Sequence, residues 1–142
     1  MMPIRLENEA ATVAYAQKLA KQIKPGQVIA LSGELGAGKS VFSRALMRAL
    51  GVTDEALPSP TFALIQTYDG KDCQVAHMDW YRLDDADEIE MLGVRDYFEP
   101  PWISIIEWPG RNLSILPPDT IHIEIKTAPD DFELRFLSCN SI

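Results

Sequence analysis

The residues with the clearest chemistry form the stretch GELGAGKS at positions 33–40. It matches the pattern G-x-x-x-x-G-K-[ST] at every fixed position. In such a loop the glycines let several backbone N–H groups turn towards a phosphate, and the following helix adds the positive end of its dipole. The Lys39 ammonium would reach the β- and γ-phosphates, and the Ser40 hydroxyl would bind Mg²⁺. The alternative, a glycine-rich turn before a chance Lys-Ser pair, does not explain the buried strand and amphipathic helix that flank the loop.

A phosphate site of this kind also needs a carboxylate that holds the metal at the end of a neighbouring strand. Two acids qualify, because Asp79 follows the apolar run 75–78 and Glu107 follows the run 103–106. The second run is more apolar, as expected of a central strand buried on both faces, so Glu107 is the favoured metal ligand. Asp79 would then orient the attacking water or contact the metal through water. Either acid could instead be a solvated carboxylate at a strand end.

Three further side chains have both a structural and a functional interpretation. Thr61 lies in the proline-rich segment 58–62, where it could close on the γ-phosphate as switch threonines do, or cap a turn. His77 would share a strand face with Asp79, although a lone histidine at a strand end is more often structural. Trp108 sits beside the favoured metal ligand, whereas the other two tryptophans are expected to pack in the core.

The elements around these residues predict an α/β fold with a sheet of mixed direction. Asn8 can cap a helix that ends before Pro25-Gly26, and a second amphipathic helix follows the glycine-rich loop. The short apolar runs 28–31 and 103–106 are typical of strands buried on both faces. Two hairpins and one short helix complete the pattern, with strands expected at 63–68, 74–78, 121–125 and 132–136 and the helix at 84–93.

Composition limits the partners of the chain. At 142 residues the length predicts one domain, 1–142, and a hydrophobic fraction of 46% is enough for one core. The net charge of −8 disfavours direct, non-specific binding of a polyanion such as nucleic acid. No apolar run approaches membrane-spanning length, so a cytoplasmic protein with no membrane contact is expected. Cys73 and Cys139 form no C-x-x-C pair, and a disulfide between them is not expected in that compartment.

Taken together, these stretches resemble the TsaE family, also called YjeE, the P-loop ATPases of bacterial threonylcarbamoyladenosine tRNA modification. The matching segments come in the family's order and at about its spacing, and they are GELGAGKSVFSRAL at 33–46, SPTF at 59–62, HMDWYRL at 77–83, GVRDYF at 93–98 and IIEWPGR at 105–111. The loop alone occurs in many families, but the combination is specific. The chain departs from the family at Ser40, where threonine is common, and at Glu34, where aspartate is usual. Metal binding is not put in doubt, because serine and threonine both present a hydroxyl.

The resemblance implies a P-loop core with a mixed sheet and an antiparallel edge, and it implies ATP or ADP and Mg²⁺ as ligands. By this resemblance, the residues that act in hydrolysis are Lys39, Asp79 and Thr61. The metal ligands are Ser40 and Glu107. The residues that contact the nucleotide are Thr12, Glu34, Leu35, Gly36, Ala37, Gly38, Lys39, Ser40 and Trp108.

The resemblance also implies partners. Family members are weak ATPases alone and act with the TsaD and TsaB proteins, which carry the catalytic site for placing threonylcarbamoyl on adenosine 37 of tRNA. Nucleotide hydrolysis would reset that complex, and tRNA would be met only through it. The small size and acidic balance of the chain fit a subunit that acts on a protein partner.

Three rival functions share the loop. A small-molecule kinase usually closes several arginines over the phosphates, whereas Arg82, Arg95 and Arg111 are scattered along the chain. A GTPase switch would carry an N-K-x-D guanine motif, which the sequence lacks. A non-enzymatic module would bind nucleotide without turnover, and its effect on a partner would survive the change Asp79→Ala.

Overall fold

A computed structural model of the chain describes residues 3–34, 37–58, 60, 64–81, 83, 85–110 and 113–140. The helices and strands, with two 3₁₀ turns labelled η, are in chain order β1 (Ile4–Leu6), α1 (Glu9–Ala20), β2 (Val28–Gly33), α2 (Lys39–Ala49), β3 (Ile65–Asp69), β4 (Gln74–Asp79), α3 (Ala86–Met91), η1 (Val94–Tyr97), β5 (Trp102–Glu107), η2 (Leu113–Ile115), β6 (Ile121–Ala128) and β7 (Asp131–Asn140).

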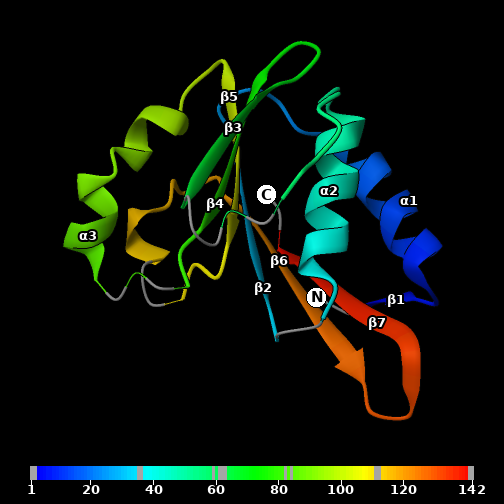
Figure 1. The fold of residues 1–142 in the computed structure, drawn as a ribbon. Coiled ribbons are helices and arrows are strands. Elements are labelled where there is room, and N and C mark those ends of the chain that lie inside the picture. The colour runs from blue at the N-terminus through cyan, green and yellow to red at the C-terminus, as the bar shows by residue number, and fades with distance from the viewer. Residues whose placement is uncertain are drawn as a thin grey trace.

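The seven strands form one sheet in the order β1-β7-β6-β2-β5-β4-β3. The central strand β2 runs parallel to β5 and β6, and β4 runs parallel to β5. The outer strands β3, β7 and β1 pair antiparallel with their neighbours. Helices α1 and α2 cover one face of the sheet and α3 lies on the other (Figure 1). The predicted α/β fold with a mixed sheet and antiparallel edges is confirmed.

The central strand is apolar on both sides because helices cover both faces of the sheet. Ile29 and Leu31 pack in the cluster that contains α1 and α2. Val28 and Ala30 pack in the cluster that contains α3 and both 3₁₀ turns. A strand whose every residue is buried reads as a continuous apolar run, which is why the run 28–31 was recognisable without alternation.

The same alternation fixes the direction of the polar residues on β4 and β5. Val75 and Ile105 belong to the cluster on the α2 side. Side chains two residues apart on a strand face the same side, so His77, Asp79 and Glu107 also face α2. The helix that follows the glycine-rich loop therefore covers the carboxylates that end the two neighbouring strands.

The first helix begins as predicted, with one element ahead of it that the pattern did not reveal. The Asn8 side chain accepts a hydrogen bond from the Ala11 backbone N–H at 3.0 Å. Thr12 is buried and Val13 only half-buried, so the helix is rotated slightly from the expected apolar face. Strand β1 is three residues long and pairs only with β7, too short a segment for periodicity to predict.

The β6–β7 hairpin was predicted, but its tip is irregular. The pairing register shifts between Thr127 and Ala128, and residues 132–134 lie between the two registers. Alternation alone groups Phe132 with the buried Leu134, yet Phe132 is 91% exposed. The hairpin tip lies at the same end of the sheet as the start of α2 (Figure 1).

The remaining predictions concern β3, α3, the two cysteines and membrane-spanning helices. The strand predicted at 63–68 is present as β3, which extends to Asp69, and the helix predicted at 84–93 is present as α3, which ends at Met91; Ala63 and Asp84 lie outside the described residues. Cys73 and Cys139 are both free thiols. Among the described residues, no helix is both long and apolar enough to cross a membrane.

Candidate functional site

The glycine-rich loop connects β2 to α2 and depends on glycine at its two described ends. Gly38 occupies the N-cap position of α2 with φ 100°, a conformation that residues with a Cβ rarely adopt. A Cβ on Gly33 would lie 2.5 Å from the carbonyl oxygen of Ile125 on β6, so this position has no room for a side chain. Leu35 and Gly36 lie outside the described residues.

Lys39 is held at the mouth of this loop. Its Nζ atom donates to the carbonyl oxygens of Gly33 at 2.5 Å and Glu34 at 3.1 Å. The same ammonium lies 3.6 Å from the centre of the Trp108 ring, a cation–π contact. The lysine is only 6% exposed, so the whole side chain is folded along the loop.

The electrostatic balance at Lys39 has two opposing parts. Burial lowers the pKa of the ammonium below its ordinary value, because desolvation disfavours the charged form. The negative charges of Glu107 and Asp79 act in the opposite direction and partly offset that shift. One partly desolvated cation therefore faces two acids, a distribution that suits an anionic ligand with a bound divalent cation.

Trp108 is positioned by its backbone as well as by its ring. Its φ of 58° lies in the left-handed region, and its N–H donates to the Leu31 carbonyl oxygen at 3.0 Å. The ring also packs against Tyr81, with the two centroids 5.1 Å apart. Non-glycine residues at positive φ are enriched at functional sites, so this backbone makes Trp108 a candidate site residue.

The two predicted carboxylates lie side by side. Asp79 and Glu107 are paired in the parallel register of β4 and β5, and they are 7% and 5% exposed. Asp79 Oδ1 accepts a hydrogen bond from the Tyr81 backbone N–H at 2.9 Å. Glu107 Oε2 lies 2.5 Å from His77 Nε2. Neither acid is the solvated strand-end residue that the alternative interpretation required.

The donor set fits a magnesium ion shared with a phosphate. Ser40 lies in the first turn of α2, half-buried, on the helix that covers Glu107. The described residues contain no group of three His, Cys, Asp or Glu side chains that could hold a metal ion by themselves. Mg²⁺ usually takes one or two protein ligands and fills its remaining positions with phosphate oxygens and water. One hydroxyl and one buried carboxylate match that requirement.

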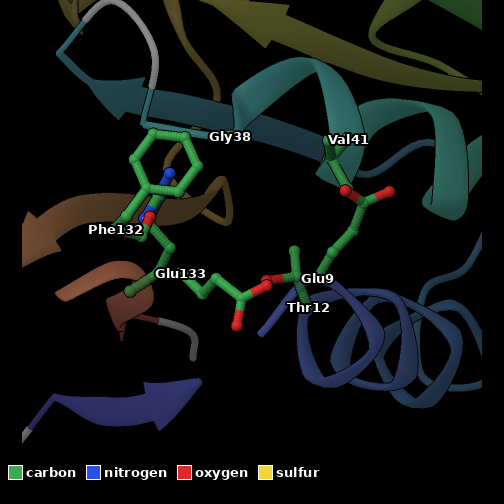
Figure 2. A pocket seen from close by; sticks show the side chains of 7 residues that line it. Glu9, Thr12, Gly38, Val41, Phe132 and Glu133 are labelled. Atoms are coloured by element: carbon green, nitrogen blue, oxygen red, sulfur yellow. The ribbon is translucent and has the colours of Figure 1, made fainter. Parts of the chain in front are cut away.

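A cavity of about 150 Å³ opens beside the loop (Figure 2). The residues that line it come from the start of α1, the start of α2 and the tip of β7, and they are Glu9, Thr12, Gly38, Val41, Phe132, Glu133 and Arg135. The Glu133 side chain extends from β7 towards Thr12 on α1. Arg135 Nε donates to the Ala37 carbonyl oxygen at 3.1 Å and so ties the hairpin to the loop.

A second hollow, of about 340 Å³, lies on the other flank of the loop. Glu34 and Trp108 border it from the loop side, and Glu124 and Lys126 border it from β6. The described ends of the glycine-rich loop thus each border a hollow, Gly38 the smaller one and Gly33 the larger one.

The predicted site residues that the structure describes gather around the end of β2. They are Thr12, Glu34, Ala37, Gly38, Lys39, Ser40, Asp79, Glu107 and Trp108. Thr61, like Leu35 and Gly36, falls outside the described residues. Sequence reasoning missed the cavity residues of β7, because the irregular hairpin tip breaks the alternation that would have oriented them. The only signal was an aromatic residue, Phe132, directly after a turn.

A buried parallel strand, a glycine-rich loop with a lysine, and a helix lying over strand-end carboxylates define an α/β protein of the P-loop class. The family model described as "Threonylcarbamoyl adenosine biosynthesis protein TsaE" matches residues 6–135. The chain therefore belongs to the TsaE family, as its motifs predicted.

Individual relatives support the same family assignment. The tRNA threonylcarbamoyladenosine biosynthesis protein TsaE of Bacillus subtilis is 39% identical over 127 residues, which are 89% of this chain and 78% of the relative. The protein of the same name from Haemophilus influenzae is 37% identical over 111 residues, 78% of this chain and 70% of the relative. The solved structure of Bacillus subtilis YdiB superposes with a TM-score of 0.81 at 30% identity and covers 99% of this chain and 85% of that one.

Proposed function

We propose that the chain is a cytoplasmic, Mg²⁺-dependent ATPase subunit needed for the N6-threonylcarbamoyladenosine modification at position 37 of tRNA. It would act on the TsaD and TsaB proteins and meet tRNA only through them. The observation that carries the proposal is the placement of Lys39 opposite the paired acids Asp79 and Glu107 at the end of β2. The names of the relatives support the biological process.

Different residues of the chain would bind the phosphates and the metal ion. The backbone N–H groups at the start of α2 and the Lys39 ammonium would hold the phosphates. To do so, the ammonium would exchange the carbonyls of Gly33 and Glu34 for phosphate oxygens. Ser40 and Glu107 would hold Mg²⁺, which when bound neutralises charge on the phosphates.

Asp79 is suited to a different task. It lies beside Glu107 in the same register and keeps one oxygen on the Tyr81 backbone N–H, so its orientation is fixed. A buried, fixed carboxylate can accept a hydrogen bond from the attacking water and orient it. Thr61 is proposed to close on the γ-phosphate from the segment between α2 and β3.

The smaller cavity is the proposed place of the base. Its volume is below the ~300–1,000 Å³ of sites that enclose a whole drug-sized ligand, so it would take one end of the nucleotide. Phe132 offers an exposed aromatic face, and Thr12, Glu9 and Glu133 offer hydrogen-bonding groups. Because the cavity borders Gly38, a base bound there would leave the phosphates at the loop.

Nucleotide binding and hydrolysis would change the surface that contacts the protein partner. Tyr81 is 66% exposed and packs on Trp108, which in turn contacts Lys39. A change at the phosphate site can therefore reach the surface through two aromatic rings. The net charge of −8 supports a protein partner over direct contact with tRNA.

The testing experiment measures ATP hydrolysis with Mg²⁺, first by the pure chain and then with TsaD, TsaB and tRNA added. The proposal expects slow hydrolysis alone and faster hydrolysis on mixing. Asp79→Asn should reduce hydrolysis about 100-fold or more in both settings. The matched control is Asp69→Asn, an exposed acid at the end of β3, which should change nothing.

Two outcomes would overturn the proposal in different ways. If the partners leave the rate unchanged, the ATPase site stands but its assignment to the modification complex fails. If the pure chain transfers phosphate to a nucleoside or sugar instead of water, the small-molecule kinase replaces the proposed function.

A further inference from the structure

A buried polar contact near the loop joins two side chains from neighbouring strands. His77 Nε2 on β4 lies 2.5 Å from Glu107 Oε2 on β5, and the two side chains are 3% and 7% exposed. Ser43 on α2, itself fully buried, places its hydroxyl 3.5 Å from the same oxygen. A histidine and a helix hydroxyl thus converge on one atom of the proposed metal ligand.

The direction of the hydrogen bond follows from the surroundings of the ring. Nδ1 of His77 is buried and, within the described residues, has no hydrogen-bond partner. A carboxylate accepts hydrogen bonds and does not donate them, so Nε2 carries the hydrogen that meets Glu107. The tautomer with Nδ1–H would bury an unpaired donor and lose the contact with the acid. The ring is therefore a fixed donor to Oε2.

The two carboxylate oxygens of Glu107 have different surroundings. Both contacts of Glu107 fall on Oε2, whereas Oε1 accepts no hydrogen bond from any residue that the structure describes. Ser43 lies three residues after Ser40 on α2, so the two hydroxyls are neighbours on one helix surface. One oxygen of Glu107 is anchored, and the other is left without a hydrogen bond from the described residues.

We propose that His77 is a positioning residue that fixes Glu107 for the divalent cation. The inference rests on the proposed function, because it takes Glu107 as a ligand of Mg²⁺. Partners that orient metal ligands are typically worth about 10- to 100-fold in metal affinity. His77 touches neither nucleotide nor water in this role, so its loss should appear in the Mg²⁺ requirement and not in nucleotide binding itself.

The experiment compares three replacements of His77 in the full-length chain. His77→Leu keeps bulk without a donor, and His77→Gln returns a side-chain N–H near the place of Nε2. His77→Asn stays polar but its amide is one bond shorter. Calorimetry measures ADP affinity with EDTA and over a series of Mg²⁺ concentrations, and hydrolysis is followed over the same series. His122→Leu is the matched control, the chain's second histidine, half-buried on β6.

The expected result is a rise of about 10-fold or more in the Mg²⁺ concentration for half-maximal effect in His77→Leu and His77→Asn. ADP affinity in EDTA should stay within about twofold of wild type, and His77→Gln should recover most of the Mg²⁺ response. Should the leucine variant fail to fold, the asparagine and glutamine variants still give opposite predictions.

The inference is overturned if folded His77→Leu and His77→Asn keep the wild-type Mg²⁺ response, or if His77→Gln is as impaired as they are. A different result would reject the proposed function itself. That result is wild-type protein whose ADP affinity and hydrolysis do not respond to Mg²⁺ at all.

Discussion

The two sides of the glycine-rich loop are built on different principles. On the side of β4 and β5, Asp79 and Glu107 are buried, paired in register and anchored by hydrogen bonds. On the side of the β7 tip, Phe132 is 91% exposed and Glu133 is exposed at an irregular turn. The first side is a rigid set of charges, and the second is an open surface of mixed chemistry.

The contrast between the two sides shows which part of the site needs a fixed geometry. Charge that holds a metal and a reacting phosphate gains from a fixed, desolvated geometry, since electrostatic interactions are stronger away from water. A base gains most of its binding from contact with an aromatic face, which tolerates some freedom. The buried side should therefore determine turnover, and the open side should determine affinity.

The largest effect is expected from the lysine of the glycine-rich loop. Lys39→Ala removes a buried cation that faces Glu107 and Asp79, so hydrolysis should fall about 100- to 1,000-fold. Nucleotide affinity should fall as well, because the phosphates lose a charged donor. Steady-state hydrolysis and ADP titration check this, with Lys18→Ala on the exposed side of α1 as the control. If Lys39→Ala kept wild-type affinity and rate, the glycine-rich loop would not be the phosphate site, and the contrast between its two sides would have no functional meaning.

The next change tests the buried side alone. Glu107→Gln keeps the shape of the side chain but weakens its hold on a divalent cation, so hydrolysis should drop by about 100-fold. ADP affinity measured in EDTA should stay within about twofold of wild type. Glu124→Gln on β6 is the control, because its side chain is half exposed. A large loss of ADP affinity in EDTA would show that the two sides are not separable.

For the open side we expect the reverse of the Glu107→Gln result, a loss of ADP affinity with an unchanged rate. Phe132→Ala removes the exposed ring at the cavity, and the Kd for ADP should rise about 5- to 10-fold, as expected for an aromatic contact worth about 1 kcal/mol. The rate at saturating ATP should not change. The free energy of unfolding should change by less than about 0.5 kcal/mol, because the ring is 91% exposed.

The control for that change is Met91→Ala on α3. Met91 is 87% exposed on the opposite face of the sheet, so its removal should alter neither affinity nor stability. Equal effects of Phe132→Ala and Met91→Ala on the Kd would place the base elsewhere.

The smallest expected effect is the coupling between the two sides. In a double-mutant cycle of Glu107→Gln and Phe132→Ala, the effects on ADP binding in Mg²⁺ should add within about 0.5 kcal/mol, since the two side chains would bind opposite ends of the nucleotide. Calorimetry on the four proteins measures the coupling. A coupling above about 1 kcal/mol would mean that loop and hairpin move as one unit.

The same contrast explains what the sequence could predict. The pattern around Lys39 and the buried strands ending at Asp79 and Glu107 are local signals, because each depends on a few consecutive residues. The contact of His77 with Glu107 depends on the register of two strands that are 30 residues apart, which one sequence cannot reveal. The place of Phe132 depends on a register shift, which breaks the period that strand prediction uses.

The contact between Lys39 and Trp108 also has a spectroscopic consequence. An ammonium 3.6 Å from an indole ring perturbs its excited state, and that perturbation would disappear when the lysine turns to a phosphate. Of the other two tryptophans, Trp80 is 2% exposed and Trp102 is half-buried at the far end of β5. The emission of the unlabelled protein is thus an intrinsic optical reporter of the phosphate site, with Trp108, the indole that contacts Lys39, as the source of the change.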